Sequence, residues 1–424
     1  MTITDQLISF AAKPVPPEAS AMMSLSLYDW AACGIAGARE ADFHEFVAMQ
    51  IGVGTGSCAV FGGGFVPAAT AALINGTLSH ALDYDDTHFA HIGHPSVAVL
   101  PAVIALAQEV HADLDAVIDA ATIGVEASIL TGLWLGRVHY QVGYHQTATA
   151  GAFGATVAAC RLLGLDKAEV RTALGLCTSM ASGLKAQFGT MAKPLNAGLA
   201  ARTGVEAALW AQAGMTAAED GLAGPLGFGA THHGEGAEIN LPKKTWYISS
   251  ISHKFHACCH GLHATLEALR EAELDPEMIQ ILSIRIHPRW MSVCNIQTPK
   301  TGLQAKFSYR QTAAMMILGY DTAGIESFSE AVLQDTDVVA LRERIVVKED
   351  DRLSETQSEI TVQLANGGLR RFKHDLMTPM PLETRAAKLQ AKACALIGET
   401  QAETLWQAAQ GESLRGLTDQ LVMS

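Results

Sequence analysis

Small and apolar residues recur at helical spacing along almost the whole chain from residue 5 to about residue 240. Alanine, leucine, valine and isoleucine stand three and four positions apart, which is the spacing of one helix face. Small side chains let neighbouring helices approach closely, so the pattern predicts a tightly packed body of many helices. The clearest predicted helices cover residues 97–110, 114–130, 148–163 and 195–213.

The pattern changes near residue 242, where strand-like segments begin to alternate with helical ones. Alternating or β-branched residues predict strands at residues 281–286, 344–348, 360–364 and 369–372. The run Asn366-Gly-Gly is typical of a hairpin turn before the last of these strands. Helical segments at residues 259–272 and 305–318 lie among the strands.

A chain of 424 residues with 49% hydrophobic content is too long for one ordinary core. Helical spacing returns from Glu383 onward, so the simplest arrangement has the last helices rejoin the first body. The predicted fold class is therefore mainly α with an α+β insert. We expect a large helical domain of residues 1–241 and 384–424, and a smaller α+β lid domain of residues 242–383.

Charge and composition argue against several classes of function. The formal net charge is −14 and no basic stretch is interleaved with aromatic residues, so we expect no nucleic-acid partner. Apolar windows are interrupted before they reach membrane-spanning length, and the N-terminal residues do not resemble a secretory signal. The eight cysteines contain no CxxC pair, and GxGxxG, Walker and GxSxG motifs are absent from the sequence. We expect a cytoplasmic protein with no membrane partner and no nucleotide or flavin chemistry.

Residues 79–96 hold four histidines and three aspartates between long apolar segments. If the first half of this segment is helical, one face of that helix carries His80, Asp83 and Thr87. That face would be polar inside an otherwise apolar region. Acids and imidazoles together are what proton transfer near neutral pH requires.

The second half of the segment opens a new helix. Pro95 restricts His94 to an extended conformation, and Ser96 can cap the helix that follows. The same residue types are also metal ligands, although no recurrent ligand spacing is present. A metal site would draw on Asp83, Asp85, His88, His91 and His94. In a third interpretation these groups are structural, because they cap helix ends and pair with one another.

Two later segments add an imidazole and an ammonium group. Thr147 can cap the helix that follows it, which puts His145 at an electropositive helix end, where an imidazole tends to stay neutral. Lys193 stands just ahead of Pro194 near another helix start, an ordinary place for anion binding. Taken alone, each has a simpler interpretation, as a loop histidine and a solvated lysine.

Residues 253–263 combine four histidines, two cysteines and a lysine. A zinc site is a secondary interpretation, because Cys258 and Cys259 are adjacent and no second cysteine pair answers them. In a helix, His256, His260 and His263 would line up on one face.

These segments, in this order, resemble the MmgE/PrpD family, which includes 2-methylcitrate dehydratase, cis-aconitate decarboxylase and iminodisuccinate epimerase. The resemblance lies within residues 75–320 and is carried by HALDYDDTH…HPSVAVLPAVIALA, GYHQTATAGAFGATVAACRLLGLD, MAKPLNAGLAARTGVEAALWAQAGMT, KFHACCHGLHATLEAL and, more weakly, AKFSYRQTAAMMILG. It implies a helical large domain, an α+β lid domain, a cleft between them, homodimers, and no required cofactor or metal.

Carried over position by position, the resemblance assigns active-site roles to ten residues. The catalytic residues it implies are Asp83, His94, His145, Lys193 and Lys254. The substrate-binding residues it implies are Thr87, Cys259, His260, Tyr309 and Gln311. Two positions depart from the decarboxylase pattern. Cys259 stands where a histidine is expected, with His260 next to it, and Gln311 stands where a tyrosine is expected, with Tyr309 two residues earlier.

The implied reaction starts with removal of a proton from a carbon next to a carboxylate of a small di- or tricarboxylate. Lys193 and Lys254 would hold the carboxylates, which favours the extra negative charge of the enolate-like state. Either His94 or His145 is the base, and Asp83 would orient a histidine. The first hypothesis is a cofactor-independent dehydratase of the 2-methylcitrate type. The alternatives are an epimerase of a substituted succinate such as iminodisuccinate, a cis-aconitate-type decarboxylase, and a non-catalytic or metal-binding protein.

Overall fold

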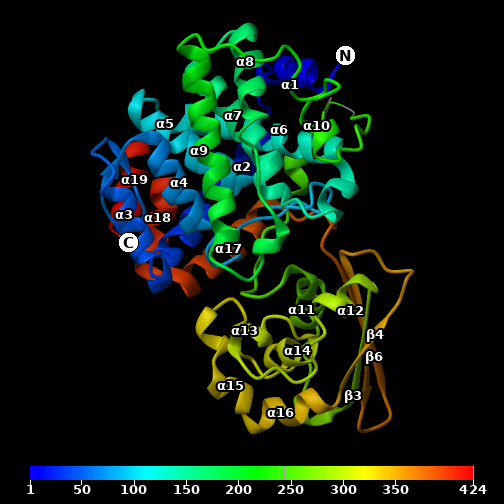
Figure 1. The fold of residues 1–424 in the computed structure, drawn as a ribbon. Coiled ribbons are helices and arrows are strands. Elements are labelled where there is room, and N and C mark those ends of the chain that lie inside the picture. The colour runs from blue at the N-terminus through cyan, green and yellow to red at the C-terminus, as the bar shows by residue number, and fades with distance from the viewer. Residues whose placement is uncertain (240, 242–243, 424) are drawn as a thin grey trace. The chain divides into compact units, whose positions relative to one another are not determined.

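The computed structural model describes residues 1–239, 241 and 244–423, which divide into two compact units (Figure 1). The first unit comprises Met1–His253 and Ile397–Ser424, and the second comprises Lys254–Leu396. The sequence placed its boundaries at residues 242 and 383. Residue 242 lies outside the described residues, and the chain returns to the first unit at Ile397.

The first unit is mainly helical. Its α-helices are α1 (Ile3–Ala11), α2 (Pro17–Gly37), α3 (His44–Ile51), α4 (Ala68–Ser79), α5 (Ser96–Glu109), α6 (Leu114–Gln141), α7 (Gln146–Leu163), α8 (Lys167–Cys177), α9 (Ala192–Gln212), α10 (Phe228–Thr231), α18 (Glu399–Ala409) and α19 (Leu414–Val422). Two short strands, β1 (Cys58–Ala59) and β2 (Phe65–Val66), pair antiparallel. The four clearest helices predicted from the sequence correspond to α5, α6, α7 and α9.

Close helix packing in this unit depends on glycine. A Cβ added at Gly124 of α6 would lie 2.5 Å from the Cβ of Ala158 on α7. A Cβ added at Gly204 of α9 would lie 2.5 Å from the Cβ of Ala155, also on α7. Both distances are too short for two carbon atoms, so the glycines let α6 and α9 approach α7. The predicted tight packing of small-residue helices is confirmed.

Helix α6 differs from one expectation. It is long and apolar enough, by length and composition, to cross a membrane, although apolar windows were expected to end sooner. Of its most apolar window, 78% is buried inside the protein. The backbone leaves helical geometry only at Gly136, near the end of the helix. Such burial is typical of the central helix of a helical domain.

The second unit packs short helices against a mixed sheet. Its strands are β3 (Ile279–Ile286), β4 (Ile345–Glu349), β5 (Gln357–Leu364) and β6 (Leu369–Asp375), in the order β4-β3-β5-β6. Strands β3 and β4 are parallel, and the other neighbours are antiparallel. The helices are α11 (His263–Arg270), α12 (Arg289–Val293), α13 (Gly302–Ala305), α14 (Tyr309–Ile317), α15 (Glu330–Gln334), α16 (Thr336–Glu343) and α17 (Leu382–Ile397). Figure 1 shows α13 to α16 on one side of this sheet.

Most of the predicted pattern of the second unit appears in the structure. All four predicted strands form, and the hairpin between β5 and β6 turns at Gly367, which has a φ of 82°. The predicted helix at 259–272 is shortened to α11, because residues 260–262 form a 3-10 turn. The predicted helix at 305–318 is shortened to α14, which residues 306–308 separate from α13. The expected fold class, mainly α with a smaller α+β part, is confirmed.

Candidate active site

The histidine- and aspartate-rich segment is a loop rather than a helix. Helix α4 ends at Ser79, and the next residue, His80, is its C-cap. Asp83 then has a φ of 51°, in the left-handed region that an aspartate tolerates but that ends a right-handed helix. The expected helix through Thr87, with a shared polar face, is therefore wrong.

Asp85 joins two imidazoles through its two carboxylate oxygens. Its Oδ1 lies 2.8 Å from Nδ1 of His80, and its Oδ2 lies 2.9 Å from Nδ1 of His94. Burial lowers the pKa of His80 to about 4, so its ring is neutral at pH 7. Burial by itself would raise the pKa of Asp85, but the two histidines hold it well below its usual range. Asp85 is therefore an anion that fixes both rings.

Asp83 connects this pair of histidines to Lys193. Its Oδ1 lies 3.2 Å from Nε2 of His94 and 2.7 Å from Nζ of Lys193. The Asp83 side chain is 46% exposed, whereas those of His94 and Lys193 are 11% and 15% exposed. Asp83 is thus the solvent-facing end of the network, and its ammonium and imidazole partners lie just beneath it.

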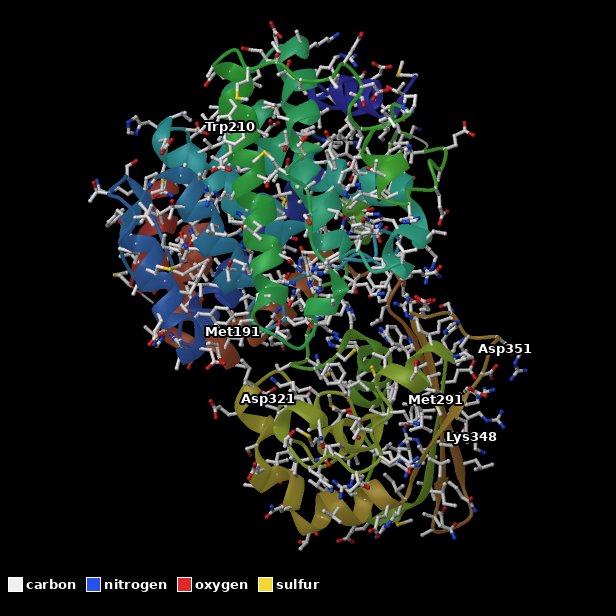
Figure 2. The ribbon with its side chains drawn as sticks, viewed as in Figure 1. Met191, Trp210, Met291, Asp321, Lys348 and Asp351 are labelled. Atoms are coloured by element: carbon white, nitrogen blue, oxygen red, sulfur yellow. The ribbon has the colours of Figure 1, made fainter. Side chains whose placement is uncertain are left out.

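Lys193 occupies the position expected from the sequence, near the start of a helix. It is the second residue of α9, and Figure 2 labels Met191, immediately before the helix, and Trp210, near its other end. An ammonium group at a helix N-terminus adds its charge to the exposed backbone N–H groups. This end of α9 is therefore suited to a carboxylate.

His145 is buried at the start of α7. It is the N-cap residue, and its backbone N–H donates to the carbonyl of Gly183 over 2.9 Å. The side-chain amide of Asn196 lies 3.3 Å from Nδ1 and can only donate to it, so the neutral ring carries its proton on Nε2. Burial, followed by the charge of Lys193, lowers the pKa of His145 well below its usual range. His145 thus lies at the helix start expected from the sequence, and its burial favours the neutral ring.

The rings of the site lie close to one another. Those of His80 and His94 are 4.6 Å apart between centroids, and those of His80 and His145 are 6.0 Å apart and stacked. The ring of His145 meets Phe188 edge-on at 5.0 Å, and Phe188 also lies 5.8 Å from the ammonium of Lys193. The first unit therefore brings together the side chains of Asp83, His94, His145 and Lys193.

Two expected helix caps take other roles. Thr147 lies inside α7, and its hydroxyl accepts a 3.0 Å hydrogen bond from the backbone N–H of His94. Ser96 is the first residue of α5, and its hydroxyl donates to Asp86. Both hydroxyls hold the 80–96 loop against neighbouring helices instead of capping them.

Thr87 fixes the same loop from its other side. It forms a two-way backbone bridge with Ser252, and its hydroxyl donates to the Ser252 carbonyl over 3.3 Å. These bonds hold the loop between Asp83 and His94 to the end of the first unit. Thr87 stays a predicted substrate-binding residue.

The residues that could bind a metal ion differ from the set suggested by the sequence. The ligand atoms of His80, Asp83, Asp85 and His94 lie within 4.8 Å of one another. Imidazole and carboxylate donors of this kind suit zinc or iron by type. A cation there would, however, have to compete with the Lys193 ammonium for Asp83.

The other two histidines of the loop face away from this cluster. The Nδ1 atom of His88 accepts the backbone N–H of His91, and Nε2 of His91 lies 3.2 Å from the Ser128 hydroxyl on α6. Burial lowers the pKa values of His88 and His91 to about 4 and about 3. Their inclusion in a metal site with Asp83 is wrong, because the turn at residues 88–93 points them into the helical core.

The second histidine-rich segment belongs to the second unit, apart from its first residue. His256, His260 and His263 do not share a helix face, because a 3-10 turn over His260–Leu262 precedes α11. His256 lies in the loop before it and contacts Glu267 at 3.0 Å and Thr322 at 2.7 Å. The expected helical row of histidines is therefore wrong.

The remaining predicted residues also lie in the second unit. Lys254 and His260 are buried, and Cys259 is partly exposed. The hydroxyl of Tyr309 donates to the carbonyl of Gly261 over 2.6 Å. The amide oxygen of Gln311 accepts a 2.7 Å hydrogen bond from Arg342.

Sequence reasoning did not assign a catalytic role to His80, Asp85 or Asn196. His80 and Asp85 stand five residues apart, which is not a helical spacing, and only the turn at Asp83 makes them partners. The signal available was their residue type within one polar segment. Asn196 stands three residues after Lys193, about one turn further along α9, a spacing that places both on one side of the helix.

Comparisons with known proteins cover both units. A family model described as the MmgE/PrpD N-terminal domain matches residues 2–239, and one described as the MmgE/PrpD C-terminal domain matches residues 256–410. A cis-aconitate decarboxylase from Homo sapiens is 26% identical over 375 residues, which are 80% of this chain and 76% of that protein.

Two fungal relatives match over a shorter stretch. A cis-aconitate decarboxylase from Aspergillus terreus is 29% identical over 62% of this chain and 58% of its own length. A cis-aconitate decarboxylase-like protein from Aspergillus oryzae is 30% identical over 58% of this chain and 56% of its own length. The match therefore spans less than two thirds of either fungal protein.

Proposed function

Because the chain belongs to the MmgE/PrpD family and its relatives are small-carboxylate lyases, we propose that its substrate is a di- or tricarboxylate, from which it removes a proton next to a carboxylate. The observation that carries this proposal is the shared contact of Asp83 with His94 and Lys193. In the proposal His94 transfers the proton and Lys193 binds the carboxylate, and both contact Asp83 at the partly exposed end of a buried network.

Lys193 supplies the charge for binding. A substrate carboxylate replaces that of Asp83 at the ammonium group of Lys193. The ammonium attracts a substrate with two or three negative charges more strongly than it attracts the single charge of Asp83. As the proton leaves the neighbouring carbon, negative charge spreads onto this carboxylate, and the ammonium stabilises it. The proposal keeps for Lys254 the role that the family resemblance implies, which is binding of a substrate carboxylate.

We rank His94 above His145 as the base. Nδ1 of His94 lies 2.9 Å from Oδ2 of Asp85; with the ring proton on Nδ1, Nε2 is left for proton transfer, the arrangement that general bases of this type use. His145 carries its proton on Nε2 because Asn196 donates to Nδ1, so its role is to donate a hydrogen bond. Asp83 and Asp85 hold His94 from opposite sides.

The first candidate reaction is loss of water, as in a 2-methylcitrate-type dehydratase. His94 takes the C–H proton, the C–H electron pair forms the new double bond, and the C–O bond breaks. The hydroxide takes a proton from the imidazolium of His94 and leaves as water. Two positions favour this over decarboxylation. Cys259 stands where the decarboxylase pattern has a histidine, and Gln311, where it has a tyrosine, is engaged with Arg342.

The second candidate is decarboxylation of a cis-aconitate-type substrate, which the names of the relatives favour. The epimerase alternative finds no support in these comparisons. The proposal includes a reaction that needs no cofactor or metal, a homodimer and a cytoplasmic location.

Incubation of the purified chain with 2-methylcitrate, citrate and cis-aconitate tests the proposal. A dehydratase produces a conjugated double bond, seen as a rise in ultraviolet absorbance, without carbon dioxide. A decarboxylase releases carbon dioxide from cis-aconitate. No turnover of any member of a wider panel of di- and tricarboxylates would reject the function.

A further inference from the structure

Two cysteines far apart in the sequence meet in the second unit. The Sγ atoms of Cys259 and Cys294 lie 3.1 Å apart, and the Cys294 thiol donates to the sulfur of Cys259. A disulfide bond is about 2.05 Å long, so the two sulfurs need to approach by only about 1 Å to be joined. Cys258, the neighbour of Cys259 in the chain, is buried.

Backbone hydrogen bonds fix both members of the pair. The N–H of Cys259 donates to the carbonyl of Lys306 over 3.0 Å, and the N–H of Cys294 donates to the carbonyl of Trp290 over 2.8 Å. The carbonyl of Cys294 accepts the N–H of Tyr309 over 3.3 Å. The sulfur contact is therefore built by the fold of the segments before α11, after α12 and before α14.

The two thiols differ in their environment. Cys259 is partly exposed, so an oxidant can reach it, whereas Cys294 is fully buried. The hydrogen bond to Cys259, together with burial, raises the pKa of Cys294 far above its usual value, so that thiol keeps its proton. Cys259 is accordingly the sulfur that is oxidised first, and Cys294 the one that resolves it.

We propose that Cys259 and Cys294 form a reversible dithiol–disulfide couple, oxidised by a peroxide and reduced by a dithiol. The sulfur of Cys259 attacks one peroxide oxygen, the O–O bond breaks, and a sulfenic acid and water result. The sulfur of Cys294 then attacks the sulfenic sulfur, the S–S bond forms, and the oxygen leaves as a second water with the thiol proton. Two thiols and one peroxide give one disulfide and two waters.

The bond would change the surroundings of a predicted substrate-binding residue. It removes the Cys259 thiol and ties the segment that carries Lys254 and His260 to the end of α12. This consequence rests on the proposed function. We expect oxidation to raise KM about tenfold with a smaller change in kcat, as loss of a binding contact does.

The couple is tested by treating the full chain with hydrogen peroxide and mapping its peptides without reduction. The expected product is one cross-linked peptide pair through Cys259 and Cys294, lighter by two hydrogens, with loss of two thiols per chain and recovery by dithiothreitol. Cys294→Ala should give no cross-link and a sulfenic acid at Cys259 that dimedone traps. Cys394→Ala, at the exposed cysteine of α17, is the matched control and should cross-link as the parent does.

Peptide mapping tests the Cys259–Cys294 disulfide independently of the proposed enzymatic function, because it does not require catalytic turnover. A peroxide dose that oxidises Cys394 but leaves Cys259 and Cys294 unlinked would overturn it. So would a bridge from Cys294 to Cys258, or dimers linked through Cys394 as the only disulfide product. If the bridge forms but KM for a substrate stays the same, the proposed effect on substrate binding is rejected.

Discussion

Two segments of this chain each hold four histidines, yet the surroundings of those histidines differ. In residues 79–96, Asp85 contacts His80 and His94. His94 in turn contacts Asp83, which is 46% exposed and also contacts Lys193. In residues 253–263, the carboxylate partner of His256 is Glu267, which is 2% exposed and also bonded to Lys388. The carboxylate of the first network reaches solvent, whereas that of the second is buried, although one of its partners, Arg270, is 39% exposed. We call the first network open and the second closed in this sense. Histidine density alone does not indicate a reaction site; what matters is whether a substrate can reach the charged groups.

The largest effect should come from the exposed end of the first network. In the variant His94→Asn, the asparagine side chain can still donate a hydrogen bond to Asp85, but it has no atom equivalent to Nε2 of the imidazole. If Nε2 transfers the proton, kcat should fall about 10³-fold. His88→Asn is the control, because an asparagine oxygen can replace Nδ1 of His88 as acceptor for the His91 N–H. Steady-state kinetics on folded variants checks this, and equal losses in both would show that the loop matters only as structure.

The second effect concerns Lys193. Lys193→Met removes the charge but keeps much of the length of the side chain, and kcat/KM should fall about 10²-fold because the enolate-like charge loses its partner. Lys185→Met is the matched control. Its ammonium donates to the Tyr140 carbonyl over 3.0 Å and is not part of the site. If the two variants have the same kcat/KM, the ammonium of Lys193 does not bind substrate.

The third effect distinguishes positioning from mere packing. Asp85→Asn keeps the shape of the side chain but removes the anion between His80 and His94. Without that anion the imidazolium of His94 is less stable, so its pKa falls. We expect about a tenfold lower kcat, with the acidic limb of the kcat/KM profile about one pH unit lower. A lower kcat with an unmoved acidic limb would assign Asp85 a purely structural role.

The sequence could predict which segments form the site, but not all of the contacts within it. Periodicity identified α5, α6, α7 and α9, and the position of Lys193 follows from the start of α9. The pairing of His80 with Asp85 depends on the left-handed turn at Asp83, which helical spacing cannot anticipate. Here a single backbone conformation decides which side chains become partners.

The same limit applies to the second unit. Cys259 and Cys294 are 35 positions apart, and their contact depends on how the segments before α11 and after α12 pack. Gln311 was carried over as a substrate-binding residue, but its bond to Arg342 of α16 arises from tertiary packing. Resemblance locates a position in the chain, whereas partners come from the whole fold.

The smallest effect on turnover should come from the closed network. Glu267→Gln should leave kcat within about threefold, but it should lower the free energy of unfolding by about 2 kcal/mol at neutral pH, because it leaves Lys388 and His256 without their anion. Burial by itself would raise the pKa of Glu267, yet His256, Arg270 and Lys388 hold it below its ordinary value of 4.5.

The pH dependence of that loss follows from the direction of the shift. A carboxyl group whose pKa is lower in the folded protein than in the unfolded chain stabilises the fold at pH values above its unfolded pKa of 4.5. This stabilisation is lost as the pH falls through the folded pKa. The gap between parent and variant should therefore be widest at neutral pH and shrink below about pH 4.5 in denaturant titrations. Glu359→Gln is the control, since its partner Arg285 is partly exposed and such pairs contribute about 0–1 kcal/mol. The distinction between the closed and the open network would fail if the difference in unfolding free energy between parent and Glu267→Gln did not change with pH. It would also fail if Glu267→Gln lowered kcat as much as Asp85→Asn does.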